Sequence, residues 1–242
     1  MKLGLLHCDE LRPQYPAMFN AWLPAEWRVY DLTRGEAPAD LDECDGFVGT
    51  GSRRSVYEDE PWILAYAELM RRMHAASKPF VGICFGHQMM GRALGGRTAK
   101  SPKGWGIGVH RFTIIAAEPW MQPPAPSFGA LMSCQDQVEV LPPGAKVLAS
   151  NDHCEVAMFR VGTLLGIQGH PEFTPEFVRP ILESRRERIG SEHVDRALAT
   201  LKEPCEATLL AGWARQFLTD ALRPLHDDAV LVQSHRRAAD DR

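Results

Sequence analysis

The sequence lacks the features by which metal-binding, secreted and membrane-spanning proteins are usually recognised. Its six cysteines are scattered with no C-x-x-C pair and no metal-ligand spacing, so neither a zinc site nor a disulfide framework is predicted. No apolar run approaches the length of a membrane span, and the apolar stretch at the N-terminus is too short for a signal peptide. We therefore expect a cytoplasmic protein with reduced thiols and no bound metal.

An excess of positive charge is also missing. The 27 Lys and Arg residues are outnumbered by 31 Asp and Glu residues, and the net charge is -4 with a pI near 6.1. Because nucleic-acid binding depends on a broad basic surface, we expect no nucleic-acid partner. No nucleotide-binding P-loop occurs, and we expect no cofactor. The remaining expectation is a small-molecule substrate.

The sequence does contain an alternation of apolar strands and amphipathic helices. Strands are predicted over 2–8, 27–32, 46–52, 79–83, 100–114, 133–150 and 163–170, and helices over 17–23, 58–76, 85–94, 174–188 and 206–222. This order predicts an α/β fold with a mixed, mostly parallel central sheet and helices on both faces. We assign one domain to residues 1–223 and a frayed, charged tail to residues 224–242.

The segment KPFVGICFGHQMMG over residues 78–91 places a cysteine between a strand and a helix. An apolar run leads to Cys84, which has Gly82 and Gly86 two residues away on either side. A turn of this kind holds a nucleophile at strained backbone angles, so its neighbours at these positions must be small. The free N–H groups at the helix N-terminus would stabilise the Cys84 thiolate. We therefore predict a nucleophile elbow.

A second candidate for chemistry lies in TLLGIQGHPEF, residues 163–173. An apolar strand leads to His170, and Glu172 follows two residues later. Residues two apart in an extended segment point to the same side, so the Glu172 carboxylate can orient the imidazole of His170. The other imidazole nitrogen would then serve Cys84 as a base. The remaining eight histidines lack such a context, and we expect packing or surface roles for them.

The motifs VGICFGHQ, GIQGHPEF and GTGS together resemble the class I glutamine amidotransferase family. The resemblance extends from the first strand to about residue 190. It implies a flavodoxin-like fold and hydrolysis of γ-glutamyl amides, with Cys84, His170 and Glu172 as the catalytic triad.

The resemblance also implies an oxyanion hole, formed by the backbone N–H groups of Gly51 and Phe85. The family usually has the sequence SGGP at the first of these positions. Here Thr50 replaces a glycine and Ser52 replaces the proline. The N–H group of Gly51 is retained, but we expect the loop to have a different shape.

The substrate-binding residues are likewise implied by the resemblance. Gln88 lies one helical turn after Cys84 and is expected to contact the glutamyl group. Gly104, Trp105 and Gly106 are expected to hold its α-amino and α-carboxylate groups. They lie in SPKGWGIGV, which is similar to the stand-alone γ-glutamyl peptidases, a branch near the glutaminases of GMP synthases.

The roles of several polar residues near these motifs stay open. Arg53 and Arg54 are either a solvated pair or contacts for a substrate carboxylate. Cys134 stands where the family commonly has histidine, and we expect it to be a small core residue. Gln135 and Asp136 are candidates for contacts with the leaving group.

The sequence thus predicts a cysteine-dependent hydrolase that cleaves γ-glutamyl peptides or N-substituted γ-glutamyl amides through a γ-glutamyl thioester. The alternative is a glutaminase subunit that supplies ammonia to a separate synthase, so a synthase partner and a homo-oligomer both stay open. A domain used only for binding is disfavoured, because Cys84, His170 and Glu172 are all present. The amine half of the substrate cannot be read from these motifs.

Overall fold

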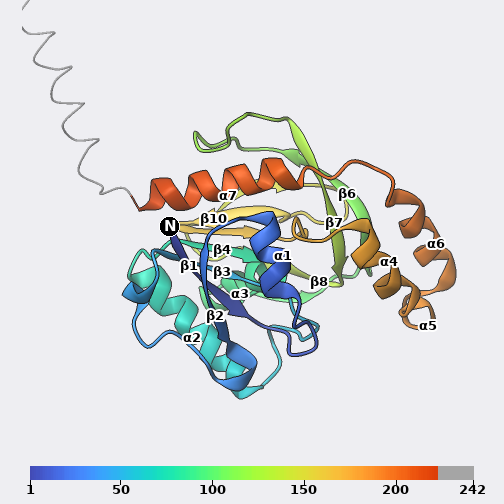
Figure 1. The fold of residues 1–242 in the computed structure, drawn as a ribbon. Coiled ribbons are helices and arrows are strands. Elements are labelled where there is room, and N and C mark those ends of the chain that lie inside the picture. The colour runs from blue at the N-terminus through green and yellow to red at the C-terminus, as the bar shows by residue number, and fades with distance from the viewer. Residues whose placement is uncertain (223–242) are drawn as a thin grey trace, which may run out of the picture.

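A central β-sheet runs through the computed structural model, which describes residues 1–222 (Figure 1). Its nine strands are β1 (Lys2–His7), β2 (Glu26–Asp31), β3 (Gly46–Gly49), β4 (Phe80–Ile83), β6 (Gly106–Ile114), β7 (Ser127–Cys134), β9 (Lys146–Ser150), β10 (Met158–Val161) and β11 (Leu164–Ile167). Two further strands, β5 (Arg97–Lys100) and β8 (Asp136–Val140), form a small antiparallel sheet of their own.

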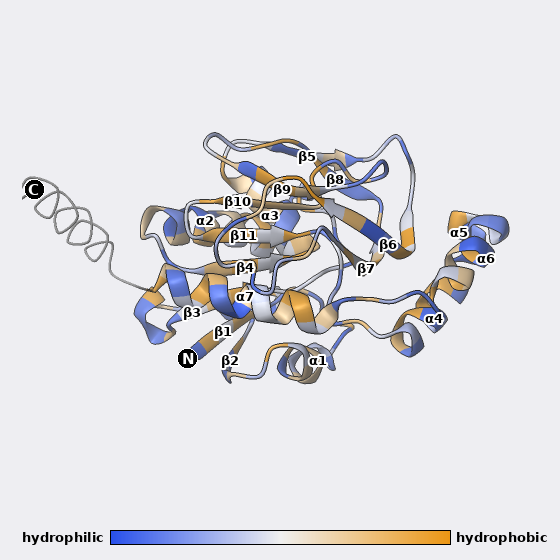
Figure 2. Cartoon of the chain, turned by 90° about the horizontal axis from the view of Figure 1, so that it is seen from above, coloured by the Kyte–Doolittle hydropathy of each residue, from blue (hydrophilic) through white to orange (hydrophobic). Residues whose placement is uncertain are grey.

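The α-helices of the described residues lie on both sides of this sheet. They are α1 (Tyr15–Trp22), α2 (Pro61–Ala75), α3 (Phe85–Ala93), α4 (Pro175–Glu183), α5 (Arg186–Ile189), α6 (Ser191–Thr200) and α7 (Ala207–Ala221). Figure 2 shows α1 and α7 on one side of the strands and α2 on the other. Proline occupies the first turn of both α2 and α4, as expected, because the missing N–H group has no partner there.

The order of the strands explains why distant motifs meet. The sheet has the order β2-β1-β3-β4-β11-β10-β9-β6-β7, in which β2 to β11 pair in parallel and β11 to β7 pair in antiparallel fashion. The parallel strands β3, β4 and β11 are neighbours, so their carboxyl ends lie along one edge. In open α/β sheets, ligands bind at this edge. The mixed sheet with a parallel core is confirmed.

Two apolar cores lie on opposite faces of the sheet. Alternate residues of β4 separate between them: Val81 and Ile83 join the core under α1 and α7, and Phe80 joins the core under α2 and α3. Because both faces are covered, the parallel strands are apolar throughout rather than alternating with polar residues. Complete burial of one such side chain contributes about 1.5–3 kcal/mol.

Two segments differ from the prediction. The four prolines of the stretch over 118–127 predict an irregular surface loop, but Trp120 and Met121 are buried there, and Trp120 packs edge-on against Phe217 of α7. The helix expected over 174–188 is broken after Glu183, where the hydroxyl group of Ser184 donates to the carbonyl oxygen of Ile181. Such a bond competes with the backbone pattern of a helix.

Two predictions concern the extent of the chain. The tail predicted over 224–242 lies outside the described residues, and the single domain over 1–223 stays a prediction. Within residues 1–222, no helix combines the length and the apolar composition that crossing a membrane requires.

Candidate active site

Cys84 occupies the turn between β4 and α3 that the glycine spacing predicts. Its φ and ψ angles are 49° and −95°, outside the regions that side-chain-bearing residues normally adopt. Its N–H group donates to the carbonyl oxygen of Ile167 at the end of β11 (2.9 Å), and its carbonyl oxygen accepts from the N–H group of Gln88 (2.9 Å). These bonds hold the strained residue in place between a strand and a helix.

The two flanking glycines are required by close backbone contacts. A Cβ atom at Gly82 would lie 2.5 Å from the carbonyl carbon of Gly86, and one at Gly86 would lie 2.9 Å from the carbonyl oxygen of Gly49. No side chain fits at either position, since backbone atoms cannot move aside as flexible side chains do. The elbow geometry expected around Cys84 is therefore present.

His170 and Glu172 form a buried pair beside the elbow. The Nδ1 atom of His170 lies 2.8 Å from Oε1 of Glu172, and both residues are nearly inaccessible to solvent. The N–H group of His170 donates to the carbonyl oxygen of Leu131 in β7 (2.7 Å), and its ring stacks on Phe173 with 3.9 Å between centroids. The imidazole is thus fixed on three sides, with its Nε2 atom left for another partner.

The charges of these groups influence one another. Burial lowers the pKa of His170, but the Glu172 carboxylate and the Cys84 group outweigh it and raise this pKa to about 10. The pKa of Cys84 is raised by a hydrogen bond with Cys134 and by burial, and His170 lowers it only in part. These influences therefore outweigh the expected stabilisation of the Cys84 thiolate by its helix N-terminus.

Gly51 lies directly against the imidazole of His170. A Cβ atom at this position would approach Cε1 of His170 to 2.7 Å. The preceding Thr50, which replaces a glycine of the family pattern, is buried, and its hydroxyl group bonds the N–H group of Cys8 (3.0 Å) and the carbonyl oxygen of Gly51 (2.9 Å). The altered turn is therefore tied to β1, with Gly51 kept beside the other predicted site residues.

Phe85 begins α3, so its N–H group has no partner within the helix. Its side chain points away from the site and packs on Tyr66 and Trp62. Only its backbone is therefore placed to act beside Cys84. The helix that follows is buried over most of its length, which keeps this N–H group in a fixed position.

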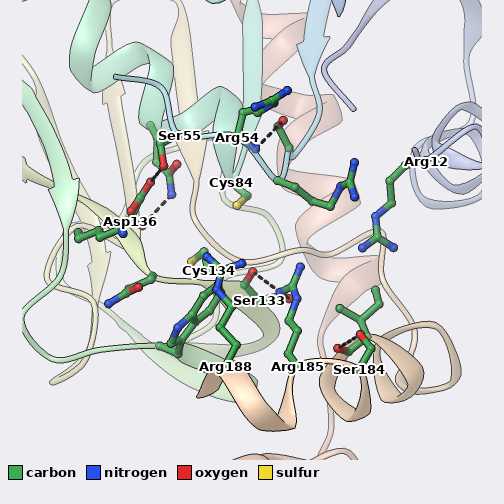
Figure 3. A pocket seen from close by; sticks show the side chains of 17 residues that line it. Arg12, Arg54, Ser55, Cys84, Ser133, Cys134, Asp136, Ser184, Arg185 and Arg188 are labelled. Atoms are coloured by element: carbon green, nitrogen blue, oxygen red, sulfur yellow. Dashed lines mark hydrogen bonds between the residues drawn. The ribbon is translucent and has the colours of Figure 1, made fainter. Parts of the chain in front are cut away.

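A cavity of about 400 Å³ opens above Cys84 (Figure 3). Gln88 and Trp105 line it, as the substrate-binding prediction requires, whereas Gly104 and Gly106 do not. Gln88 is buried, and its amide nitrogen donates to the carbonyl oxygen of Asp136 (2.7 Å) and to Oε1 of Gln168 (3.1 Å). A Cβ atom at Gly106 would meet His153 and Met132, so this glycine faces away from the cavity.

The polar residues whose roles the sequence leaves open all line the same cavity: Arg53, Arg54, Cys134, Gln135 and Asp136. Arg53 pairs with Asp9 (3.2 Å), and Arg54 pairs with Glu58 (3.3 Å) and Glu60 (3.7 Å). The carboxylate of Asp136 accepts from Ser55 Oγ (2.5 Å) and Tyr57 Oη (3.1 Å). Gln135 also lines the cavity.

Four further lining residues have positions that the sequence did not indicate. Cys134, expected to be a small core residue, interacts with Cys84, and β7, which ends at Cys134, bridges to His170 through Leu131. Arg12, Arg185 and Arg188 also line the cavity, although Arg188 reads as part of a solvated helix face. Arg185 and Arg188 follow the end of α4 at Glu183, and the sequence alone does not predict that this helix ends there.

No metal site accompanies this arrangement in residues 1–222: no group of three or more His, Cys, Asp or Glu side chains there has a geometry that could hold an ion. All six cysteines fall within this range, and none forms a disulfide. The chemistry that the arrangement supports is that of a cysteine nucleophile with a carboxylate-oriented histidine.

Comparison with known proteins identifies a family and several relatives. Residues 42–181 match the family model described as glutamine amidotransferase class-I. The chain is 32% identical to gamma-glutamyl peptidase 5 of Arabidopsis thaliana over 208 residues, which covers 79% of this chain and 83% of that protein. It is 31% identical to gamma-glutamyl peptidase 3 of the same plant over 219 residues, with coverages of 83% and 88%.

A solved structure supports the fold independently. A glutamine amidotransferase from Thermotoga maritima superposes with a TM-score of 0.73 at 20% identity, covering 92% of this chain and 98% of that one. The flavodoxin-like fold expected from the resemblance is thereby confirmed. The fold and the extent of the sequence matches together show that this protein is a hydrolytic enzyme and belongs to the class I glutamine amidotransferase family.

Proposed function

We propose that this enzyme hydrolyses the amide bond of γ-glutamyl peptides and N-substituted γ-glutamyl amides through a thioester on Cys84. The observation that carries the proposal is the meeting of Cys84 with the His170–Glu172 pair beneath one cavity. The names of the relatives, gamma-glutamyl peptidases, support the substrate class.

The first step is attack of Cys84 on the γ-carbonyl carbon of the substrate. His170 accepts the thiol proton as the sulfur–carbon bond forms, because its raised pKa favours the imidazolium next to Glu172. Negative charge then develops on the carbonyl oxygen. The N–H groups of Gly51 and Phe85 stabilise this oxyanion in the proposal, since fixed donors in a dry site act without reorganisation.

Collapse of the tetrahedral intermediate breaks the carbon–nitrogen bond. His170 returns its proton to the departing amine, which leaves the γ-glutamyl group on Cys84. His170 then takes a proton from water as the water attacks the thioester, and a second collapse releases glutamate and the free thiol. Glu172 orients the imidazole and stabilises its charged form throughout.

The size of the cavity favours an amine half larger than ammonia. About 400 Å³ is within the range of sites for small ligands, and residues from several segments line it beyond Cys84 and Gln88. A leaving group with a side chain or a further residue would occupy this space. The enzyme is therefore proposed to act as a free-standing hydrolase in the cytoplasm, without awaiting a synthase.

A steady-state assay of the purified chain tests the proposal. We expect hydrolysis of a γ-glutamyl dipeptide with a kcat/KM about tenfold or more above that for glutamine, a difference worth about 1.4 kcal/mol. Cys84→Ala should remove this activity, whereas Cys205→Ser, far from the cavity lining, should retain it. A chain inert on every γ-glutamyl amide until a synthase is added would contradict the proposal and favour the glutaminase subunit.

A further inference from the structure

Positive charge dominates the lining of the cavity above Cys84. Among residues 1–222, a single residue of the lining, Asp136, carries a carboxylate. Six lining residues of the same range are cationic: Arg12, Arg53, Arg54, Lys100, Arg185 and Arg188. This imbalance contrasts with the whole chain, whose net charge is -4, so cations are concentrated at the site rather than spread over the molecule.

The cations differ in how far protein carboxylates neutralise them. Arg53 and Arg54 each pair with carboxylates outside the cavity lining, and Arg12 lies 3.7 Å from Asp9. Lys100, Arg185 and Arg188, in contrast, have no carboxylate partner among residues 1–222, and the two arginines lie together beside Trp105. These two guanidinium groups therefore retain their full charge toward the cavity.

The structure holds both arginines in fixed positions. Nη1 of Arg185 donates to Ser133 Oγ (2.9 Å), and the guanidinium groups of Arg185 and Arg188 lie 5.5 and 4.8 Å from the ring centroid of Trp105. Figure 3 shows the two side chains rising from one segment toward the side where Cys84 lies. A guanidinium group stacked on an aromatic ring keeps its N–H donors free in its own plane, so it can still bind a carboxylate.

Three arginines in one place also repel one another. Burial lowers the pKa of Arg185, and the guanidinium groups of Arg12 and Arg188 lower it further. Arg12 is itself held over the ring of Phe177 at 5.2 Å, so the three groups cannot easily separate. Without an anion this arrangement is unfavourable, whereas a bound carboxylate would relieve the repulsion.

The γ-glutamyl half of a substrate does not supply the missing negative charge. Its α-amino group is protonated and its α-carboxyl group ionised near neutral pH, so this half carries no net charge. The additional anion must then come from the amine half. We propose that Arg185 and Arg188, stacked on Trp105, select γ-glutamyl compounds whose amine half bears a carboxylate, as in a γ-glutamyl peptide, over those whose amine half is neutral.

This inference rests on the proposed hydrolase function and predicts a matched difference between two substrates. γ-Glutamylglycine and γ-glutamylglycinamide differ only in whether the amine half ends in a carboxylate or an amide. The enzyme should have a kcat/KM about tenfold or more higher for γ-glutamylglycine, mainly through KM, because a charge-assisted bidentate hydrogen bond is lost with the amide.

Variants locate the origin of that preference. Arg188→Gln and the double variant Arg185→Gln/Arg188→Gln should bring the ratio of the two kcat/KM values toward one, because kcat/KM for γ-glutamylglycine falls by more than that for γ-glutamylglycinamide. Arg179→Gln is the matched control, since this arginine is exposed on α4 and outside the cavity lining. It should leave the ratio unchanged.

Three outcomes would overturn the inference. An equal loss for both substrates would assign the arginines to the α-carboxylate of the glutamyl half, and an unchanged ratio would mean that they do not recognise the amine half.

Calorimetric titration of the Cys84→Ala protein separates binding from turnover. Tighter binding of γ-glutamylglycine that depends on Arg188 would support the recognition even if the wild-type enzyme were inert, which would contradict only the hydrolysis. Equal binding of the two compounds would overturn the selection.

Discussion

Cys84 and His170 follow neighbouring parallel strands and meet at one edge of the sheet, whereas Arg12, Trp105 and Arg185 reach the cavity from three segments far apart in the chain. We call Cys84, His170 and Glu172 the triad, and Arg12, Arg185 and Arg188 the cationic rim. Backbone hydrogen bonds to neighbouring strands hold the triad in place, together with glycines that allow close backbone contacts. Side-chain stacking holds the cationic rim.

The difference teaches which part of the site the fold constrains. The fold fixes the backbone of the triad, because Cys84 and His170 are hydrogen-bonded to β11 and β7 through backbone atoms. The residues of the cationic rim lie on α5, at the turn before it and in the loop before α1. Reaction chemistry should therefore respond to changes in the triad, and substrate choice should respond to changes in the rim.

The largest expected effect comes from the base of the triad. His170→Ala removes both proton transfers, so kcat should fall by about a thousandfold or more. Glu172→Gln keeps the imidazole near its place but loses the charge that stabilises the imidazolium, and its loss in kcat should be smaller. Steady-state rates with γ-glutamylglycine provide the measurement. Comparable, near-normal rates in both variants would contradict the triad.

Gly51→Ala tests how tightly the triad is held without changing any of its members. The added Cβ atom would lie 2.7 Å from Cε1 of His170, so either the ring or the turn must shift from its place. We expect a loss of about a hundredfold in kcat, the scale of a misplaced catalytic group. Gly212→Ala in α7, where the nearest atom would be 3.9 Å away, is the control. Normal activity in Gly51→Ala would show that the position tolerates a side chain.

Cys134→Ala should alter the pH dependence of the triad while leaving its maximum rate nearly unchanged. The hydrogen bond with Cys134 is the largest influence that raises the pKa of Cys84. Its removal lowers this pKa, so the thiolate forms at lower pH. Iodoacetamide inactivation of the enzyme, followed against pH, should therefore shift to lower pH. An unchanged or upward shift would contradict the contact between the two thiols.

The smallest effect on activity is expected from His87, a buried histidine with no carboxylate paired to it among residues 1–222. Its pKa is lowered to about 3 by burial, so the folded state binds fewer protons than the unfolded state below pH 6.5. Stability from this group is present above pH 6.5 and is lost as the pH falls toward 3.

The comparison of two pH values measures this effect. Between pH 8 and pH 5, the loss in the free energy of unfolding should be about 2 kcal/mol smaller for His87→Leu than for the wild type. Urea unfolding at the two pH values gives these free energies. Equal losses in the two proteins would mean that His87 can accept a proton in the fold. His170, which has Glu172 beside it, should not show this acid sensitivity.

The triad was predictable because its signals are local. The Gly82–Cys84–Gly86 spacing requires an elbow, and a two-residue separation in an extended segment places Glu172 beside His170. The parallel order of strands then brings both to one edge. The buried faces of α2 and α7 were predictable for the same reason, since their apolar residues repeat with the helical period.

The cationic rim could not be predicted in the same way. Arg185 lies in the turn where the helix predicted over 174–188 is interrupted, and no sequence signal marks that interruption. Cys134 lies beside Cys84 at the end of β7, a strand that bridges to His170 through Leu131, and these segments are far apart in sequence. Trp105 contacts Arg185 and Arg188 at the start of α5 and within it, and no local pattern relates Trp105 to them.

Detection of the covalent intermediate tests the central claim most directly. The enzyme is mixed with γ-glutamylglycine, quenched in acid during turnover and digested, and the peptides are weighed by mass spectrometry. Our account predicts a γ-glutamyl adduct on the peptide that contains Cys84, and no adduct in Cys84→Ala. Undiminished hydrolysis by Cys84→Ala, or an adduct on Cys134 in place of Cys84, would contradict it.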